Sequence, residues 1–244
     1  MITVVIPISP IKSHPGIEIL SQTVESVRHW LPDAEIILTF DGVRREQEGR
    51  RAAYEAHIFR VLELADWTWG GCLPLIFDDH QHQTGMMRAA LEKIRTPLLL
   101  YVEQDTPLVT DEPIDWDAIR WFVESGQSNV VRLYHEGVTP AEHHHLMHGH
   151  NGVFIRTSQW SQRPHVASTA YYRRIIASHF TAGARSFIED QMHGVLDEAY
   201  HRDGIAGWNQ HRVHIYDPGN GNMKRSYHTD GRAGAEKFDD SQIF

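Results

Sequence analysis

The chain has 244 residues, of which 41% are hydrophobic and 23% are charged, a globular composition that argues against disorder. A single cysteine, Cys72, excludes an internal disulfide, a zinc finger built on thiolates and an iron–sulfur cluster. The net charge of −9 argues against a protein that coats nucleic acid over its whole surface. No apolar run reaches the roughly 18 residues of a membrane span and no signal peptide is apparent, so we expect a cytoplasmic protein.

Strands and helices alternate over the first 110 residues. Short apolar runs predict the strands, and apolar side chains at helical spacing predict the helices between them. The predicted strands are 3–8, 35–40, 73–77 and 97–102, and the predicted helices are 17–30, 45–64 and 84–94. This alternation is typical of βαβ units. It predicts an α/β fold with a mostly parallel central sheet and helices on both faces.

The pattern is less regular after residue 110, and we interpret the whole chain as one domain. The predicted helices there are 115–124, 168–180 and 190–200, and the predicted strands are 129–134, 153–156 and 211–216. A histidine-rich loop separates the first two of these strands. From Asp217 onward the chain is rich in Gly, Asn and Asp, which predicts a surface loop or tail.

Polar residues follow each of the first four predicted strands. They are Ser9, Asp41, Asp78 with Asp79, and the tripeptide Glu103-Gln104-Asp105. Ligands of open parallel sheets bind at the carboxyl ends of the strands. Because no glycine-rich dinucleotide motif or P-loop is present, these carboxylates suggest Mg²⁺ or Mn²⁺ carrying the phosphates of a nucleotide. In extended backbone Glu103 and Asp105 would point the same way, so both could face one ion or one ribose.

The order and spacing of these pieces resemble the GT-A fold glycosyltransferases, most closely their family 2-like group, over roughly residues 1–200. The motifs that carry the resemblance are 3–9, Phe40-Asp41-Gly42, Gly85-Met86-Met87-Arg88, Glu103-Gln104-Asp105, 150–156 and 187–191. Two positions depart from the family pattern. Glu103 stands where the family has the first acid of Asp-x-Asp, and Ala89 stands where an asparagine is usual.

The resemblance implies a metal-dependent enzyme that moves a sugar from a nucleoside-diphosphate sugar to an acceptor hydroxyl. It implies that residues 1–110 form the nucleotide-sugar-binding half and residues 111–244 the acceptor-binding and catalytic half. Asp190 would be the catalytic base of an inverting transfer, and Asp105 with the late His228 would hold Mn²⁺ or Mg²⁺. The expected contacts to the nucleotide sugar are Pro7, Ser9, Asp41, Arg88, Glu103 and Gln104.

Residues 151–188 suggest the acceptor. They contain five arginines and no acid, interleaved with aromatic residues, which favours contact with phosphates and exposed bases. The stretches 160–165 and 171–174 also look like bacteriophage glycosyltransferase-like proteins, some of which are thought to decorate hydroxymethylated DNA bases. This resemblance implies a DNA acceptor in the cytoplasm of a host cell. The expected acceptor contacts are Trp160, Arg163, Arg173 and Arg174.

Other readings stay open. The arginines could face water, and the acceptor could be a small molecule, a lipid-linked sugar or a protein. A nucleotidyltransferase on a similar sheet is the second enzyme class, although the loop 9–16 is poor in glycine. A non-catalytic metal-binding protein is the third class, because six of the 18 histidines lie between His135 and His150. We expect Trp67, Trp69, Trp116 and Trp121 to pack in the core. No feature of the sequence predicts an oligomeric state.

Overall fold

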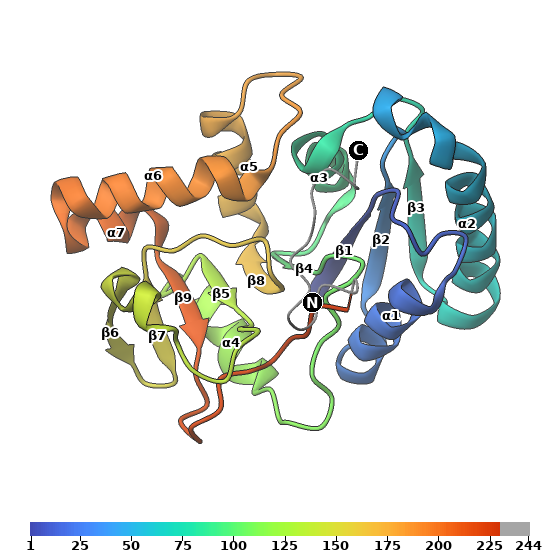
Figure 1. Cartoon of the computed structure of the whole chain (residues 1–244). Helices are drawn as coiled ribbons and strands as arrows, with labels where there is room; N and C mark the ends of the chain where they lie inside the picture. The colour runs from blue at the N-terminus through green and yellow to red at the C-terminus, as the bar shows by residue number, and fades with distance from the viewer. Residues whose placement is uncertain (230–244) are drawn as a thin grey trace.

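The structure is a computed structural model that describes residues 1–229. In these residues nine strands form one sheet, in the order β3-β2-β1-β4-β8-β5-β9-β7-β6 (Figure 1). The strands of the first half are β1 (Ile2–Ile8), β2 (Glu35–Phe40), β3 (Cys72–Ile76) and β4 (Leu98–Tyr101). All pairs among these four strands are parallel. Their carboxyl ends therefore lie along one edge, as predicted from the apolar runs.

The second half of the chain extends the same sheet with mixed pairing. Its strands are β5 (Val130–Arg132), β6 (Met147–Asn151), β7 (Phe154–Thr157), β8 (His165–Ser168) and β9 (Val213–Tyr216). Strand β8 runs antiparallel between β4 and β5, so β5 is parallel to β4 and ends at the same edge. Both halves thus contribute strands to one domain, and the predicted α/β class is confirmed.

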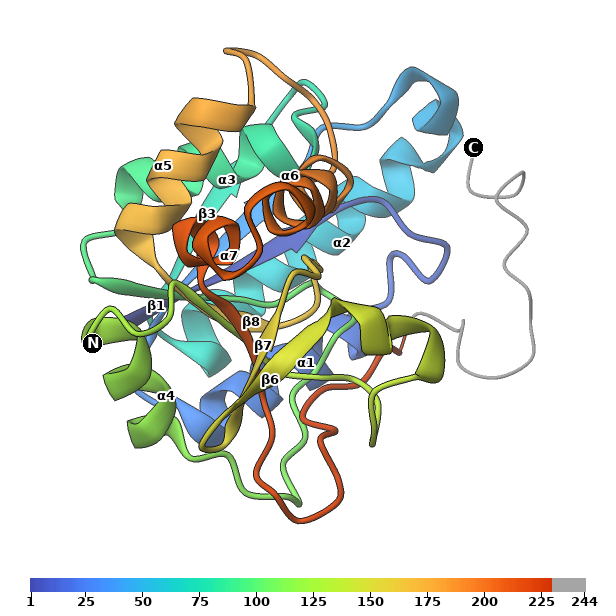
Figure 2. The ribbon, with the colours of Figure 1, turned by 90° about the vertical axis from the view of Figure 1, so that its left-hand side faces the viewer.

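Helices cover both faces of the sheet. Helices α1 (Glu18–Trp30), α2 (Arg51–Leu64) and α4 (Trp116–Glu124) bury apolar side chains against one face. Helices α3 (His82–Lys93), α5 (Thr169–His179) and α6 (Ile188–Asp203) pack on the other, and the short α7 (Ile205–His211) follows α6. Figure 2 shows α3, α5 and α6 above the sheet and α1 and α4 below it.

Several predicted details are wrong. The predicted helix 45–64 is a 3₁₀ turn, Arg45–Arg50, followed by α2. Strands β6 and β8 and helix α7 were not predicted. Trp67 and Trp121 are 85% and 61% exposed, so they lie outside the core, whereas Trp69 is buried.

The segment after β9 is more than a surface tail. Figure 1 shows this segment, in red, turning back toward the middle of the sheet. Arg225 and Ser226 are fully buried, and the backbone N–H groups of both donate to the Tyr134 carbonyl. The Arg225 guanidinium donates to the carbonyls of Pro113 and Asn222. These bonds pair both backbone N–H groups and two of the three guanidinium nitrogens, which explains how a Gly- and Asn-rich segment lies inside the molecule. The third nitrogen is buried without a partner among residues 1–229. We call residues 222–229 the strap.

Candidate active site

The site begins where β4 ends. After Tyr101 the chain forms a turn, in which the Thr106 N–H donates to the Glu103 carbonyl over 3.1 Å. The expectation that Glu103 and Asp105 share an extended backbone is therefore wrong. The turn sends their side chains to different neighbours. Glu103 accepts a 2.9 Å hydrogen bond from Gln83, whereas Asp105 meets the strap.

Asp105 and His228, 123 residues apart in sequence, form a pair at this edge. The His228 Nε2 lies 3.1 Å from the Asp105 Oδ2. Backbone bonds on both sides of His228 fix its position, because the Tyr227 N–H donates to the Pro107 carbonyl and the Thr229 N–H to the Asp105 carbonyl. The two side chains keep 14% and 23% of their surface exposed, so a ligand can reach them.

Asp41, at the end of β2, is placed quite differently. Its buried carboxylate accepts hydrogen bonds from the backbone N–H groups of Gly42, Gln81 and His82. The His80 Nδ1 lies 2.8 Å from its second oxygen without hydrogen-bonding orientation, and burial lowers the pKa of His80. The carboxylate of Asp41 therefore holds the loop that leads into α3.

The ends of β1 and β4 are joined by polar contacts. Pro7 is buried inside β1, opposite Thr39 of β2. The Gln104 side chain donates to the carbonyl of Ser9, and the Thr23 hydroxyl donates to the carbonyl of Gln104. Pro7 and Gln104 thus have structural roles at this edge of the sheet, whereas the half-buried Ser9 keeps part of its surface accessible to a ligand.

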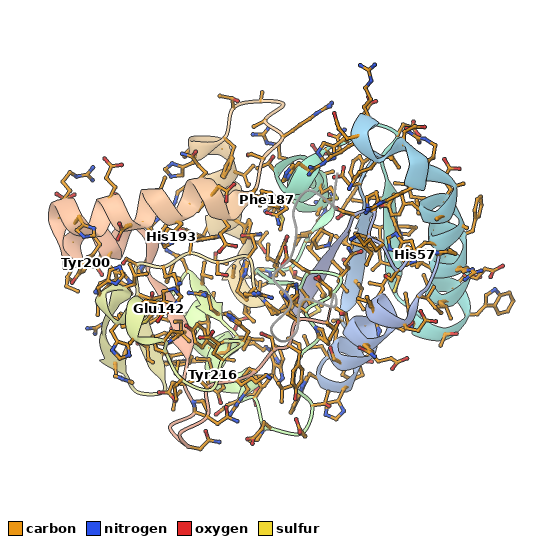
Figure 3. All side chains as sticks on the ribbon, in the orientation of Figure 1. His57, Glu142, Phe187, His193, Tyr200 and Tyr216 are labelled. Carbon is orange, nitrogen blue, oxygen red and sulfur yellow. The ribbon has the colours of Figure 1, made fainter. Side chains whose placement is uncertain are left out.

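The N-terminal end of α6 closes the site on the other side. Gln83 of α3 links it to Glu103, because its side-chain oxygen accepts from the Ile188 N–H over 3.1 Å. The ring of His82 packs edge-on against Phe187, and Figure 3 shows Phe187 between α6 and α3. Gln83 was not singled out in the sequence, and no local motif marks it.

The two acids of the first α6 turn face different surroundings. Glu189 is half-buried, and its carboxylate accepts a 3.1 Å hydrogen bond from the Gln162 N–H. Asp190 is exposed, and none of residues 1–229 donates a hydrogen bond to its carboxylate. Of the two acids, Asp190 is the one open to a substrate.

Three of the arginines predicted for the site, Arg88, Arg173 and Arg174, donate hydrogen bonds to backbone carbonyls of neighbouring segments. Arg88 donates to the carbonyls of Phe180 and Thr181, and Arg173 to those of Leu91 and Ile94. Both line a groove of about 590 Å³ between α3 and α5. Arg174 donates to the Gln210 carbonyl and lines a cavity of about 640 Å³ among α5, α6 and α7. Neither hollow is lined by Asp105, His228 or Asp190.

Trp160 is 1% exposed, and its indole N–H donates to the side chain of Gln162. It packs in the core against Tyr172 and His165, so its ring has no face open to an acceptor. Arg163, two residues before the start of β8, is half-buried on the site side of the sheet. Arg163 lies just before β8, whose first residue pairs with the last residues of β4 and β5.

Arg132 is a residue of this edge that the sequence analysis missed. It ends β5, is 2% exposed, and donates to the backbone and side-chain oxygens of Gln159. Burial lowers its pKa to about 10, so the guanidinium is still charged at neutral pH. The available signal was an arginine inside the apolar run 130–133.

The residues at Asp105 fit a hard divalent cation that also binds phosphate. The 3.1 Å between Asp105 Oδ2 and His228 Nε2 is close to the roughly 3 Å between adjacent ligands of an octahedral ion with bonds of about 2.1 Å. Within residues 1–229 no three His, Cys, Asp or Glu side chains gather as a metal site. Two protein ligands suit an ion that completes its shell with substrate phosphates and water.

No protein-family model and no curated protein sequence matches this chain. Solved structures do resemble it. TarS 1–349 of S. aureus, in complex with UDP-GlcNAc, matches at a TM-score of 0.59 and 12% identity, over 97% of this chain and 59% of that chain. GalNAc-T7 with UDP, GalNAc and Mn²⁺ matches at 0.60 and 12%, over 93% and 43%. CMP:2-keto-3-deoxy-manno-octonic acid synthetase complexed with CTP matches at 0.50 and 12%, over 88% of each chain.

At these identities the likeness establishes the fold, which is the GT-A fold of the glycosyltransferases TarS and GalNAc-T7. The fold implied by the sequence resemblance is thereby confirmed. The chain spans about 60% of the TarS 1–349 chain and less than half of the GalNAc-T7 chain. Among the described helices, none has the length and apolar character needed to span a membrane.

Proposed function

We propose that this chain is a metal-dependent glycosyltransferase that moves a sugar from a nucleoside-diphosphate sugar to an acceptor hydroxyl. The pairing of Asp105 with His228 at the carboxyl edge of a GT-A sheet carries this proposal. Solved structures of similar fold were determined with UDP-GlcNAc, or with UDP, GalNAc and Mn²⁺. These bound molecules support a nucleotide-sugar donor for this chain.

In the proposed reaction the first half of the edge binds the donor. Ser9 and the loop held by Asp41 would contact the nucleoside, and Glu103 would face the ribose or sugar. Asp105 and His228 would hold Mn²⁺ or Mg²⁺, whose charge stabilises the diphosphate as it leaves. The two protein ligands come from opposite halves of the chain, so the strap would complete the donor site.

Asp190 would act as the catalytic base. Its carboxylate would accept the proton of the acceptor hydroxyl while that oxygen attacks the anomeric carbon and the bond from this carbon to the diphosphate breaks. A single displacement with one base inverts the anomeric configuration. Glu189 is less suited to this role, because the Gln162 N–H already occupies its carboxylate.

A hydroxymethylated DNA base as the acceptor stays a prediction. The arginines that suggested it are dispersed, and Arg173 and Arg174 bind carbonyls of neighbouring helices. Transfer of labelled sugar to hydroxymethylated DNA, compared at low and moderate salt, tests the idea directly. A DNA acceptor predicts a steep loss of affinity as salt rises.

A thermal-shift screen of UDP-, GDP-, CMP- and dTDP-linked sugars, with and without Mn²⁺, tests the proposed donor site. One class should raise the stability only with the metal, by about 2.7 kcal/mol at 100 times its dissociation constant. Stabilisation by none of them would contradict the proposal. A nucleotidyltransferase is the second candidate, because the CTP-bound synthetase has a similar fold. Metal-dependent release of pyrophosphate from CTP would favour it.

A further inference from the structure

Two arginines lie together at the α6 end of the site. Arg132 ends β5 and Arg163 lies just before β8, and the register of the sheet places Arg132 opposite His165. The charge of Arg163 contributes to the lowered pKa of Arg132, and both arginines contribute to that of His135. The three side chains therefore share one neighbourhood, next to the part of the chain that binds the strap.

This pair is short of partners. The Nε of Arg132 and one Nη of Arg163 are buried without a hydrogen-bond partner among residues 1–229. In the same range neither guanidinium forms an ion pair. Glu189 is the carboxylate that acts on Arg132 through space, but it accepts its hydrogen bond from the Gln162 N–H. Tyr134 lies under Arg132, with its ring centre 5.6 Å from the guanidinium carbon.

Two neighbouring guanidinium groups that form no ion pair with residues 1–229 are costly to keep. A buried charge destabilises a fold unless it is paired and hydrogen-bonded, and two like charges repel one another. Planar guanidinium groups bind phosphate and carboxylate through paired N–H donors. A cluster of this kind therefore fits an anion supplied by a ligand, reached first through the half-exposed Arg163.

We propose that Arg132 and Arg163 form an anion-binding subsite that takes a phosphate or carboxylate group of the acceptor substrate. This inference rests on the proposed glycosyltransferase function. The placement argues for the acceptor over the donor, since β8 and β5 lie beyond β4 from the nucleoside side of the sheet. The Glu189 carboxylate, which interacts electrostatically with Arg132, belongs to the residue directly before the proposed base Asp190. The acceptor would then carry a negative charge close to the hydroxyl that receives the sugar.

The test is a calorimetric titration of inorganic phosphate into the full chain, with and without saturating UDP and Mg²⁺. Arg163→Gln and Arg132→Met remove the two charges, and Arg51→Gln, an exposed arginine of α2 paired with Glu48, is the matched control. We expect phosphate to bind in the presence of UDP. Each of the two variants should weaken it at least about tenfold, as for a lost charge-assisted hydrogen bond, and the control should not.

The titrations with and without UDP distinguish a subsite for the acceptor from one for the diphosphate of the donor. If phosphate competes with UDP and both variants weaken UDP to the same extent, the subsite serves the donor and the proposal is overturned. Equal phosphate binding by wild type and both variants, or none by any of them, also overturns it. If UDP fails to bind but phosphate binding without nucleotide depends on both arginines, the proposed function fails and the anion site stands.

The melting temperature of Arg132→Met gives a second readout. Because Arg132 forms no ion pair with residues 1–229, removing its charge should leave the melting temperature unchanged or higher. A structural role would lower the melting temperature instead. Loss of phosphate binding in the better exposed Arg163→Gln variant keeps the test informative if Arg132→Met does not fold.

Discussion

Asp41 directly follows β2, and Asp105 lies in the turn after β4 at the same edge of the sheet, yet their carboxylates are used in opposite ways. Asp41 is 2% exposed and accepts backbone N–H groups from its own loop and from the start of α3. Asp105 meets one imidazole, that of His228, and keeps part of its surface exposed. A carboxylate surrounded by the N–H groups of its own chain stabilises the fold. A carboxylate paired with one partly exposed histidine is open to a ligand.

The largest expected effect is on nucleotide binding by Asp105→Ala. If Asp105 holds the metal as proposed, its removal should weaken Mn²⁺-dependent UDP binding by about 100-fold or more, at the upper end of what disturbing a metal site costs. The unfolding free energy should change by less than about 1 kcal/mol, because little of the fold depends on this side chain. Calorimetry and denaturant unfolding measure the two effects. Wild-type affinity for UDP with Mn²⁺ in this variant would refute the metal assignment.

Asp190→Asn tests the exposed acid in the first turn of α6, which, like Asp105, is accessible to a ligand. Loss of the base should lower turnover by about 100-fold or more while donor binding and folding are retained. Glu189→Gln is the matched control, and its smaller loss would assign the proton transfer to Asp190. A product that keeps the anomeric configuration of the donor would count against a single base.

Asp41→Asn should have a different signature. The amide replaces one acceptor oxygen with a donor that faces backbone N–H groups, so the unfolding free energy should fall by about 1–3 kcal/mol. UDP affinity per folded molecule should change less than in Asp105→Ala. Urea unfolding monitored by circular dichroism gives the stability. A variant as stable as wild type would show that the loop 80–82 does not depend on this carboxylate.

A further prediction concerns the pH dependence of stability. Burial lowers the pKa of His165 from 6.5 to about 4, and its ring bonds to the Arg163 carbonyl and the Tyr172 hydroxyl. In the unfolded chain the His165 imidazole becomes protonated below about pH 6.5, whereas in the folded chain it becomes protonated only near pH 4. The free energy of unfolding should therefore decrease as the pH is lowered across this window, by up to about 1.4 kcal/mol per pH unit for this one proton.

His165→Gln tests this pH dependence. Glutamine has no titratable group, so the variant takes up one proton fewer on unfolding at low pH. The slope of unfolding free energy against pH should then be shallower between about pH 4 and 6. An unchanged slope would mean that His165 is not the group responsible. His214 is also buried with a lowered pKa, and His214→Asn is a parallel case.

The sequence was sufficient for the parallel half of the sheet, and it singled out Asp105 and His228, whose side chains the structure places 3.1 Å apart. Runs such as 3–8 and 97–102 are apolar throughout because strands buried on both faces have no polar side to show. Strands β6 and β8 were missed because they are short and include His148, His150 and His165, whose strand conformation comes from pairing with neighbours. Strand propensity depends on such context.

The strap and the supporting residues could not be predicted from local patterns. Met223 and Arg225 lie in a Gly- and Asn-rich stretch that is typical of loops, and the buried arginine donates to the distant Pro113 carbonyl as well as to carbonyls of its own segment. Gln83 joins Glu103 to α6 through contacts 20 and 105 residues apart in sequence. Such links depend on the finished fold. The resemblance could therefore single out Asp105 and His228 as candidates, but it could not predict their surroundings.

The most direct test of the central claim is a double-mutant cycle on Mn²⁺-dependent UDP binding with Asp105→Ala, His228→Ala and the double variant. If the two side chains hold one metal ion, each single variant should lose most of the metal-dependent affinity. The double variant should then be little weaker than either single variant, because residues that act on one ion are strongly coupled. Small and additive losses, with Mn²⁺ still enhancing UDP binding in the double variant, would contradict a metal site at Asp105 and His228.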